Sequence, residues 1–442
     1  MCGRCGVGLA QHDTRFEVPA LAGRRFLGQV SMTKRFGPGE YDRREFMASA
    51  ATLGTGVLGL AGRDVLAEAP SDSSRVVTGK NAQLVVHKSE IPVIETPSVL
   101  LDSQITPLDV LFVRNNQPLK NAATLKPFPL KGWNIALTGL VDKPRRFDAE
   151  MLAGMDQVEH EMVLQCCGNG RSLFAGSVKA KGTQWTRGGM GNVRVSGVRL
   201  SSVIRKLGVH IGSGARFLTA EGKDAPLPGK EDFEHSLPLD EAIQHSVLAT
   251  RINGQPIPAV HGGPVRLMTP GFYGTMHIKW VSRLRFENGE TDNYNQIPRY
   301  RVPRNQLQPG KPIKYTFANS TACWRMKTKC VVLAPEPDAA VAADKPFAVR
   351  GVAFNDGSTR IDSVQLSTDR GQTWSRVRLE VPRSRFAWYR WSATVSLPAG
   401  SRELWARTVD ALGRTQPLDG SIHWNPSGYE WNGVEKIAVT VG

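Results

Sequence analysis

The segment from residue 162 to residue 172 joins an apolar run to a cysteine and a glycine-rich turn. Met162 to Gln165 has the length and composition of a buried strand, and Cys166 follows it directly. The glycines of the turn Gly168-Asn169-Gly170 accept positive φ angles and let another group approach the backbone closely. We therefore expect a strand that delivers the Cys166 thiol to a turn against which a large ligand can lie.

Arg171 ends this turn, and we expect it to reach the same pocket. There its charge would lower the pKa of the Cys166 thiol and bind an anion. Two other interpretations fit the spacing equally well. Cys166 is a buried structural cysteine in one of them, and in the other it forms a disulfide with the adjacent Cys167.

The composition is that of a globular protein with two or three domains. Of 442 residues, 40% are hydrophobic and 22% are charged, which excludes collagen-like, coiled-coil and wholly disordered chains. Lys and Arg outnumber Asp and Glu by 56 to 40 and give a net charge of +16. Such a surplus favours an anionic partner.

An export signal is expected within residues 1–70. The stretch Phe46–Gly62 carries no charge, but it is shorter than the roughly 20 apolar residues that span a bilayer. The pair Arg43-Arg44 precedes it, and the small residues of Ala67-Glu68-Ala69 follow it. This pattern resembles a twin-arginine signal and predicts a periplasmic protein. An amphipathic helix with a chance arginine pair is the alternative.

A start at Met32 would give this signal ordinary proportions and would leave Cys2 and Cys5 outside the protein. No second cysteine pair at matching spacing completes a zinc site with these two residues. The cysteines that remain downstream are too few for a disulfide framework. Because twin-arginine export carries folded proteins, it suggests a cofactor inserted before export.

Residues 71–311 are expected to form an α+β domain. Short β-rich runs alternate there with two helical patterns, Ser201–Leu207 and Leu239–Gln244. Neither a G-x-G-x-x-G sequence that opens a helix nor a Walker A sequence occurs. The strands that we expect are Gln83–His87, Asn134–Leu140, His160–Gln165 and Ile278–Phe286.

Residues 312–442 are expected to form an immunoglobulin-like β-sandwich, reached through a polar, proline-rich connector at Ile297–Pro312. Trp391–Leu397 alternates apolar and polar residues with a period of two. A hairpin is predicted around Asp369-Arg370-Gly371-Gln372. Several such strands over roughly 110 residues are typical of this fold.

The segment that contains Cys166 is similar to the C-x-G-N-x-R segment of the sulfite oxidase family of molybdenum enzymes. Four further regions resemble the family's motifs in the same order, and together with the expected C-terminal β-sandwich they cover nearly the whole chain beyond the leader. These regions are Leu111–Asn115; Lys181–Trp185 with Gly191–Arg194 and Gly197–Leu200; Asn253–Pro258 with His261–Arg266; and Pro270–Trp280. The resemblance implies a molybdopterin-binding domain over residues 71–311 and an immunoglobulin-like dimerisation domain over residues 312–442.

The resemblance also implies the roles of individual residues. Cys166 would supply the protein thiolate to molybdenum, and a soft thiolate suits a redox-active metal. Arg114 and Arg171 would grip a substrate oxyanion with their planar donor groups. Trp185 would wall the pocket unless it is ordinary core, and Tyr300 falls near the position of the family's active-site tyrosine.

A larger set is implied to bind the cofactor, with charge-assisted hydrogen bonds from its basic members to the pterin phosphate. This set is Phe112, Val113, Arg114, Asn115, Asn116, His261, Arg266, His277, Ile278 and Lys279. Two departures from the family stand out. Asn116 replaces a histidine, so one pterin or proton contact is expected to differ, and the stretch Trp424–Tyr429 lacks an arginine common in related chains.

The function implied by the resemblance is periplasmic, molybdopterin-dependent oxidation of sulfite, or a related sulfur oxyanion, to sulfate. No C-x-x-C-H haem attachment sequence occurs, so we expect no haem in this chain and a separate c-type cytochrome that accepts single electrons. A homodimer or a complex with a cytochrome subunit is expected, without nucleic acid and without a membrane span in the mature protein. The alternatives are a SoxC-type sulfane dehydrogenase subunit and a non-catalytic exported interaction protein that has kept the fold.

Overall fold

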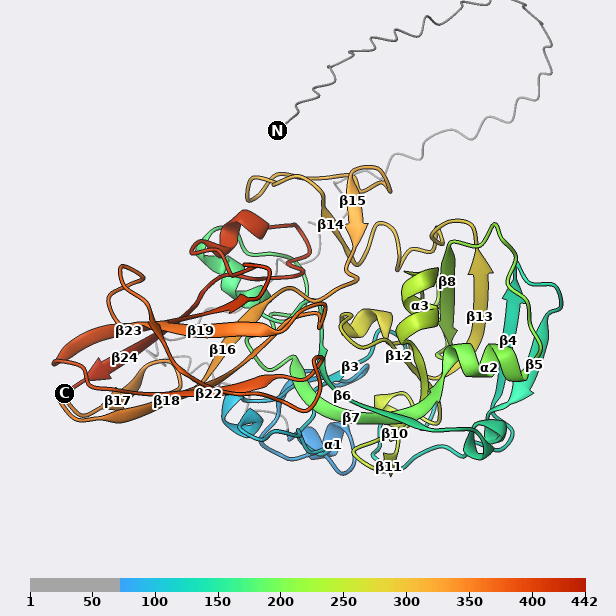
Figure 1. The fold of residues 1–442 in the computed structure, drawn as a ribbon, viewed down its shortest axis with the longest axis horizontal. Coiled ribbons are helices and arrows are strands. Elements are labelled where there is room, and N and C mark those ends of the chain that lie inside the picture. Colours follow the sequence, from blue (N-terminus) through green and yellow to red (C-terminus); the bar gives the residue numbers. More distant parts are fainter. Residues whose placement is uncertain (1–71) are drawn as a thin grey trace, which may run out of the picture. The chain divides into compact units, whose positions relative to one another are not determined.

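A computed structural model describes residues 72–442 of the chain (Figure 1). The expected leader, with Arg43 and Arg44, lies outside these residues. In the described part an α+β region is followed by a β-sandwich, which confirms the expected fold class. None of the helices within residues 72–442 is long and apolar enough to cross a membrane.

The sheet that leads to Cys166 has the strand order β11-β10-β7-β6, and β12 pairs with β10. Its strands are β6 (Val158–Gln165), β7 (Met190–Arg199), β10 (Val247–Ile252), β11 (Gln255–Pro256) and β12 (Arg266–Met268). The last five residues of β6 are all buried, and they include the apolar run Met162–Leu164, which is typical of a strand covered on both faces. Because β6 ends at Gln165, which pairs with Met190 of β7, Cys166 is the first residue beyond the strand.

A second five-stranded sheet has the order β5-β4-β13-β8-β9. Its strands are β4 (Asn134–Gly139), β5 (Arg145–Asp148), β8 (Phe217–Gly222), β9 (Glu234–Pro238) and β13 (Val281–Glu287). The helices α2 (Leu200–Lys206) and α3 (Leu239–His245) agree with the two helical patterns in the sequence. The strand expected from Ile278 begins three residues later, because Trp280 has a φ of +52° and interrupts the extended backbone.

Shorter elements complete this region. They are α1 (Ser73–Val76), β1 (Val85–Lys88), β2 (Val93–Glu95), β3 (Val113–Arg114), β14 (Arg301–Pro303) and β15 (Ser320–Ala322). β3 pairs with the edge of β2, so Arg114 is placed by a three-stranded sheet. The expected connector Ile297–Pro312 contains a strand, since β14 pairs with β15 directly after Tyr300.

The C-terminal region contains a four-stranded sheet, β16-β18-β22-β21, and a five-stranded sheet, β17-β24-β23-β19-β20. The first consists of β16 (Lys329–Ala334), β18 (Phe347–Phe354), β21 (Arg378–Glu380) and β22 (Tyr389–Val395). The second consists of β17 (Ala339–Val341), β19 (Ile361–Ser367), β20 (Ser375–Arg376), β23 (Gly400–Asp410) and β24 (Glu435–Val441). The predicted hairpin is present as β19 and β20, whereas β21 pairs with β22 in the other sheet.

A buried apolar cluster joins the sandwich to the segment after β6. It includes Cys167 from that segment, Cys323 from the loop before β16, Trp388 beside β22, and Tyr429 from the C-terminal segment. Tyr300 belongs to the same cluster. The C-terminal region therefore takes part in positioning the residues that surround Cys166.

Candidate active site

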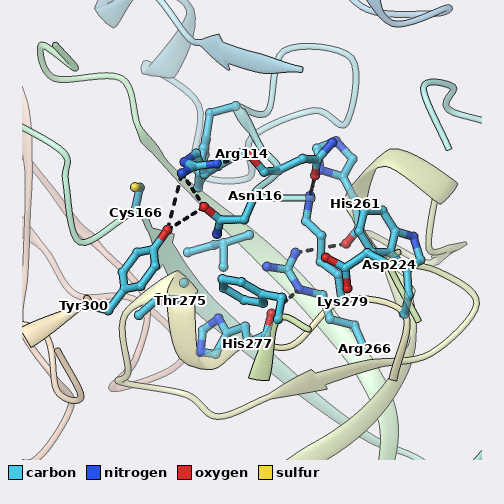
Figure 2. A pocket seen from close by; sticks show the side chains of 16 residues that line it. Arg114, Asn116, Cys166, Asp224, His261, Arg266, Thr275, His277, Lys279 and Tyr300 are labelled. Atoms are coloured by element: carbon cyan, nitrogen blue, oxygen red, sulfur yellow. Dashed lines mark hydrogen bonds between the residues drawn. The ribbon is translucent and has the colours of Figure 1, made fainter. Parts of the chain in front are cut away.

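A cavity with about 670 Å³ of empty space lies beyond the C-terminal end of β6 (Figure 2). Most of the candidate residues line it, although they come from distant parts of the sequence. The lining residues are Phe112, Arg114, Asn115, Asn116, Leu164, Cys166, Asp224, Phe233, His261, Arg266, Gly274, Thr275, His277, Lys279, Trp280 and Tyr300. Cys166, Arg114 and Tyr300 lie at one end, and we call this the thiol end.

Arg114, Asn116 and Tyr300 form a hydrogen-bonded triangle at the thiol end (Figure 2). The Tyr300 hydroxyl donates to Asn116 Oδ1 at 2.7 Å. Arg114 Nη2 donates to the same Asn116 oxygen and, at 3.3 Å, to the Tyr300 hydroxyl oxygen. Since Nη1 donates to the Asn115 carbonyl, two of the five guanidinium N–H groups are left to bind an anion.

Cys166 is partly exposed to the cavity and is not in a disulfide, so the vicinal disulfide with Cys167 is not present. The Cys166 amide donates to the Gly189 carbonyl at 2.8 Å, and the Gly168 amide lies 3.4 Å from the Cys166 sulfur. Contact with the Cys167 thiol, together with burial, raises the pKa of the Cys166 thiol well above its usual value.

This direction corrects the expectation that a nearby arginine leaves the thiol acidic. Arg114 and Arg171 do lower the pKa of Cys166, but by less than the neighbouring thiol and burial raise it. Without a metal the thiol therefore keeps its proton. Binding of a metal to this sulfur must then release a proton.

Arg171 and Trp185 do not line the cavity. Arg171 is buried, and its Nε and Nη1 groups donate to the carbonyls of Ser427 and Thr183 at 2.7 and 2.6 Å. Trp185 is fully buried in a core cluster, with its ring 6.0 Å from that of Phe112. Trp185 thus touches a residue that lines the cavity without lining it itself.

The other end of the cavity is strongly basic. Arg266 is buried, and its Nε and Nη1 groups donate to the carbonyls of His277 and His261, which leaves three N–H groups free. Lys279 Nζ donates to Asn115 Oδ1 and to the Val260 carbonyl, each at 2.6 Å, which leaves one N–H group free. The Asp224 carboxyl lies near enough to Lys279 to oppose the fall in the pKa of that lysine. We call this region the basic end.

Burial depresses the pKa values of these bases. It lowers the pKa of Arg266 to about 9 and that of Lys279 well below its usual value. These two buried cations share one nearby carboxyl group, Asp224, whose pKa is raised to about 7 by burial, so the basic end favours a bound anion. The free N–H groups of Arg266 and Lys279 are suited to the oxygens of a phosphate.

His277 provides a neutral acceptor between the two ends. Burial, together with the charge of Arg266, lowers the pKa of His277 to about 3. Nε2 lies 2.9 Å from the Thr269 carbonyl and must donate to it, while Nδ1 is buried with no partner among the described residues. The unpaired Nδ1 can therefore accept a hydrogen bond from a ligand in the cavity.

The other residues that the resemblance assigns to cofactor binding differ in whether they line the cavity. Phe112, Asn115, Asn116 and His261 line it, as the resemblance implies. Val113 and Ile278 are fully buried in apolar clusters and do not line it. Val113 anchors β3, which carries Arg114, and Ile278 anchors the segment that carries His277 and Lys279.

Several site residues had no signal in the sequence. Asp224, in the loop after β8, is the carboxyl group that lines the cavity, and burial raises its pKa to about 7. Lys80 is buried and uses all three N–H groups on His261 Nε2, at 3.0 Å, and on the carbonyls of Leu108 and Leu111. An isolated lysine or aspartate in a loop gives no pattern that separates it from a surface residue.

Two further side chains, Tyr429 and Arg299, pack against Tyr300 at the thiol end. The Tyr429 ring stacks on that of Tyr300 at 5.2 Å, and the Arg171 guanidinium lies 5.3 Å from the Tyr429 ring centre. The Arg299 guanidinium lies 5.3 Å from the Tyr300 ring centre. The sequence contains no motif that marks either Tyr429 or Arg299.

Comparisons with known proteins agree with this geometry. An oxidoreductase molybdopterin binding domain matches residues 123–295, and a Mo-co oxidoreductase dimerisation domain matches residues 320–441. Mitochondrial sulfite oxidase of Mus musculus is 28% identical over 354 residues, which cover 78% of this chain and 63% of that protein. Nitrate reductase [NAD(P)H] of Hordeum vulgare is 28% identical over 373 residues, with 78% of this chain and 40% of that protein covered.

The chain therefore spans less than two thirds of the length of these two relatives. A solved structure resembles it over a larger share. The sulfane dehydrogenase SoxCD from Paracoccus pantotrophus is 25% identical with a TM-score of 0.67, and the match covers 87% of this chain and 93% of that one.

Proposed function

Because the chain belongs to the sulfite oxidase family of molybdopterin oxidoreductases, we propose that it oxidises sulfite to sulfate with a bound molybdopterin cofactor. The observation that carries the proposal is the distribution of groups in the cavity. A single thiol, Cys166, lies beside Arg114 at one end, and the buried cations Arg266 and Lys279 line the other with Asp224 as the carboxyl group near them.

The cavity fits this cofactor group by group. Arg266 and Lys279 offer free N–H groups to its phosphate, and Asp224 and His277 Nδ1 offer acceptors to the N–H groups of its pterin. Cys166 offers a sulfur ligand to molybdenum. When bound, the cofactor supplies a metal centre that exchanges two electrons and an oxygen atom with a substrate.

The chain's own residues orient the substrate. Arg114 keeps two N–H groups for an oxyanion, and its position is fixed by its bonds to Asn115, Asn116 and Tyr300. Because Asn116 Oδ1 accepts the Tyr300 proton, the tyrosine hydroxyl oxygen is free to accept from Arg114. Arg171 acts from outside the cavity. Its charge lowers the pKa of Cys166, and its hydrogen bonds go to the backbone of this chain.

The proposal extends to partners and location. The protein is exported to the periplasm by the signal within residues 1–70, and it passes single electrons to a separate c-type cytochrome. The match of residues 320–441 to a dimerisation domain supports a homodimer or a complex with a cytochrome subunit. The basic charge of the chain supports an anionic substrate.

A second candidate function is oxidation of sulfane sulfur. It is favoured by the match to the sulfane dehydrogenase SoxCD, which covers more of that protein than of the sulfite oxidases. Sulfane sulfur carried on a protein is bulky and is not a free anion, so it differs from sulfite in both size and charge. Arg114 at the thiol end, with two unused N–H groups, therefore supports sulfite as the substrate.

Steady-state assays of the molybdenum-loaded protein test the proposal, with cytochrome c as acceptor and sulfite, thiosulfate or nitrate as substrate. We expect sulfite to reduce cytochrome c with the highest kcat/KM. Turnover of thiosulfate alone would favour sulfane oxidation. A protein that holds molybdenum and turns over none of these compounds would support the non-catalytic alternative.

A further inference from the structure

A chain of buried hydrogen bonds runs from an ion pair to the Thr275 hydroxyl in the cavity. Arg301 is fully buried and pairs with Glu290, and Gln296 Nε2 donates to the same Glu290 oxygen at 2.6 Å. Gln296 Oε1 lies 2.8 Å from His235 Nδ1, and His235 Nε2 lies 2.9 Å from Thr275 Oγ1. Nothing in the proposed function uses His235 or Thr275.

The donor and the acceptor of each hydrogen bond between Glu290 and Thr275 are fixed. The carboxylate of Glu290 only accepts, so the donor it receives from Gln296 must be the amide nitrogen. The other amide atom, Oε1, also accepts from the Ser236 amide at 3.3 Å. His235 Nδ1 must therefore carry the proton that it shares with Gln296.

His235 then has no proton at Nε2. The ring is fully buried, and burial lowers the pKa of His235 to about 4, so the imidazole is neutral and carries one proton. Nε2 must accept, and the Thr275 hydroxyl must donate to it. The hydroxyl proton is thus directed away from the cavity, and the Thr275 oxygen presents only lone pairs to it.

Thr275 lies at the thiol end. It belongs to the short 3-10 turn Gly274–Met276, and a Cβ on Gly274 would lie 3.0 Å from the carbonyl oxygen of Gln165, the residue before Cys166. His235, its partner, packs edge-on against Tyr300 at 5.2 Å. Figure 2 shows Thr275 between Tyr300 and His277.

We propose that Thr275 accepts a hydrogen bond from the group bound at the thiol end, and that His235 is a positioning residue that holds the hydroxyl in this orientation. Arg114 supplies donors and Thr275 supplies an acceptor, so this end prefers an occupant that has both an anionic oxygen and an O–H or N–H group. Two sources fit: a protonated oxyanion, or an N–H group of the cofactor. This inference rests on the proposed function only for the identity of the occupant.

Four variants of the full-length, molybdenum-loaded protein test the proposal. Thr275→Val removes the hydroxyl at nearly constant volume, and Thr275→Ser keeps it. His235→Leu releases the hydroxyl proton, whereas His235→Gln can still accept from Thr275 and donate to Gln296. Thr328→Val is the matched control, because Thr328 is a buried threonine that donates to Asp410 in the sandwich.

Two measurements that need no turnover distinguish the sources. The first is the molybdenum and pterin content per folded chain. The second is the affinity at pH 7 for hydrogenphosphate, which carries an O–H group, against sulfate, which carries none, measured by calorimetry. Loss of one neutral hydrogen bond should change an affinity by about three- to tenfold.

If the donor belongs to an oxyanion, Thr275→Val and His235→Leu should weaken hydrogenphosphate binding by this factor and leave sulfate binding unchanged. If it belongs to the cofactor, both variants should lose molybdenum and pterin instead. In either case Thr275→Ser, His235→Gln and Thr328→Val should match the parent. If Thr275→Val matches the parent in both measurements, the proposal is wrong. If His235→Leu does not fold, the Thr275→Val measurements alone decide.

The proposed function can fail separately. A parent protein that holds molybdenum but does not oxidise sulfite would refute sulfite oxidation. The content and anion-affinity comparisons between Thr275→Val and the parent would still decide the role of Thr275, because neither depends on turnover.

Discussion

The Nε group of Arg171 donates a hydrogen bond of 2.7 Å to the backbone carbonyl of Ser427. The arginine that ends the turn after Cys166 is thereby fixed to the C-terminal segment, and its second bond, to the Thr183 carbonyl, fixes a third part of the chain. The packing of its guanidinium on Tyr429 adds to this role. Arg171 thus gives two of its N–H groups to backbone carbonyls and lies outside the cavity lining, whereas Arg114 lines the cavity and keeps two N–H groups for an anion.

Replacing Arg171 by Met should mainly lower stability. Each hydrogen bond from a charged donor contributes about 1.5 to 3 kcal/mol to the free energy of unfolding, and two are lost. Arg171→Lys should recover only part of this loss, since it lacks the planar donor group. Denaturant unfolding measures the effect. An unchanged free energy of unfolding with a raised KM for sulfite would instead make Arg171 a direct substrate ligand.

Replacing Arg114 by Met should mainly lower activity. We expect kcat/KM for sulfite to fall roughly tenfold to hundredfold for each charge-assisted bond lost, with molybdenum still bound. The fall should exceed that in Arg171→Met, while Arg146→Met, at an exposed position on β5, serves as a control. Equal kinetics in Arg114→Met and the parent would place the substrate elsewhere.

Asp224 should make the stability of the cofactor-free protein depend on pH. Because burial raises its pKa from 3.8 to about 7, the unfolded chain holds fewer protons than the folded one between these values. The free energy of unfolding should therefore fall as pH rises from about 4 to 7, by up to roughly 4 kcal/mol from this group.

Asp224→Asn removes this dependence, so the variant should gain stability relative to the parent between pH 5 and pH 8. Denaturant unfolding of both proteins without cofactor at the two pH values measures the difference. A difference that does not change with pH would show that the Asp224 carboxyl is not held protonated by burial. The same variant should bind less pterin if Asp224 accepts from the pterin N–H groups.

The export signal can be tested by changing Arg43 and Arg44 together to Lys. The charge of the leader is unchanged, but the arginine pair that the twin-arginine pathway reads is lost. We expect the protein to accumulate in the cytoplasm, as measured by cell fractionation and immunoblotting. Normal recovery from the periplasm would exclude this pathway.

The sequence predicted those parts of the fold that depend on local pattern. The apolar run of β6 was sufficient to place Cys166 at the end of a strand, and the alternating runs within residues 312–442 were sufficient to predict a sandwich. The predicted start of β13 was wrong by three residues. The positive φ of Trp280 ends the extended backbone there, and the spacing of apolar residues in the sequence does not reveal it.

The sequence predicted only those site residues that belong to a recognisable motif. The resemblance brought Arg114, His261 and Lys279 together, and the structure places all three around the cavity. It could not find Lys80, Asp224 or His235, since their roles arise from burial and from partners that are distant in the sequence, such as His261 for Lys80 and Gln296 for His235. It also could not foresee that backbone carbonyls would accept two hydrogen bonds from Arg171, because that depends on where the C-terminal segment packs.

In the proposed function, Cys166 is the protein ligand of molybdenum in a sulfite-oxidising enzyme. Cys166→Ser substitutes a harder and far less acidic ligand, whereas Cys167, which is buried beside it, does not line the cavity. The decisive measurement is sulfite-dependent reduction of cytochrome c by the folded, purified parent, Cys166→Ser and Cys167→Ala proteins. We expect turnover in the parent and in Cys167→Ala and none in Cys166→Ser. Turnover in Cys166→Ser, or loss of turnover in Cys167→Ala alone, would contradict the assignment of Cys166 as the ligand.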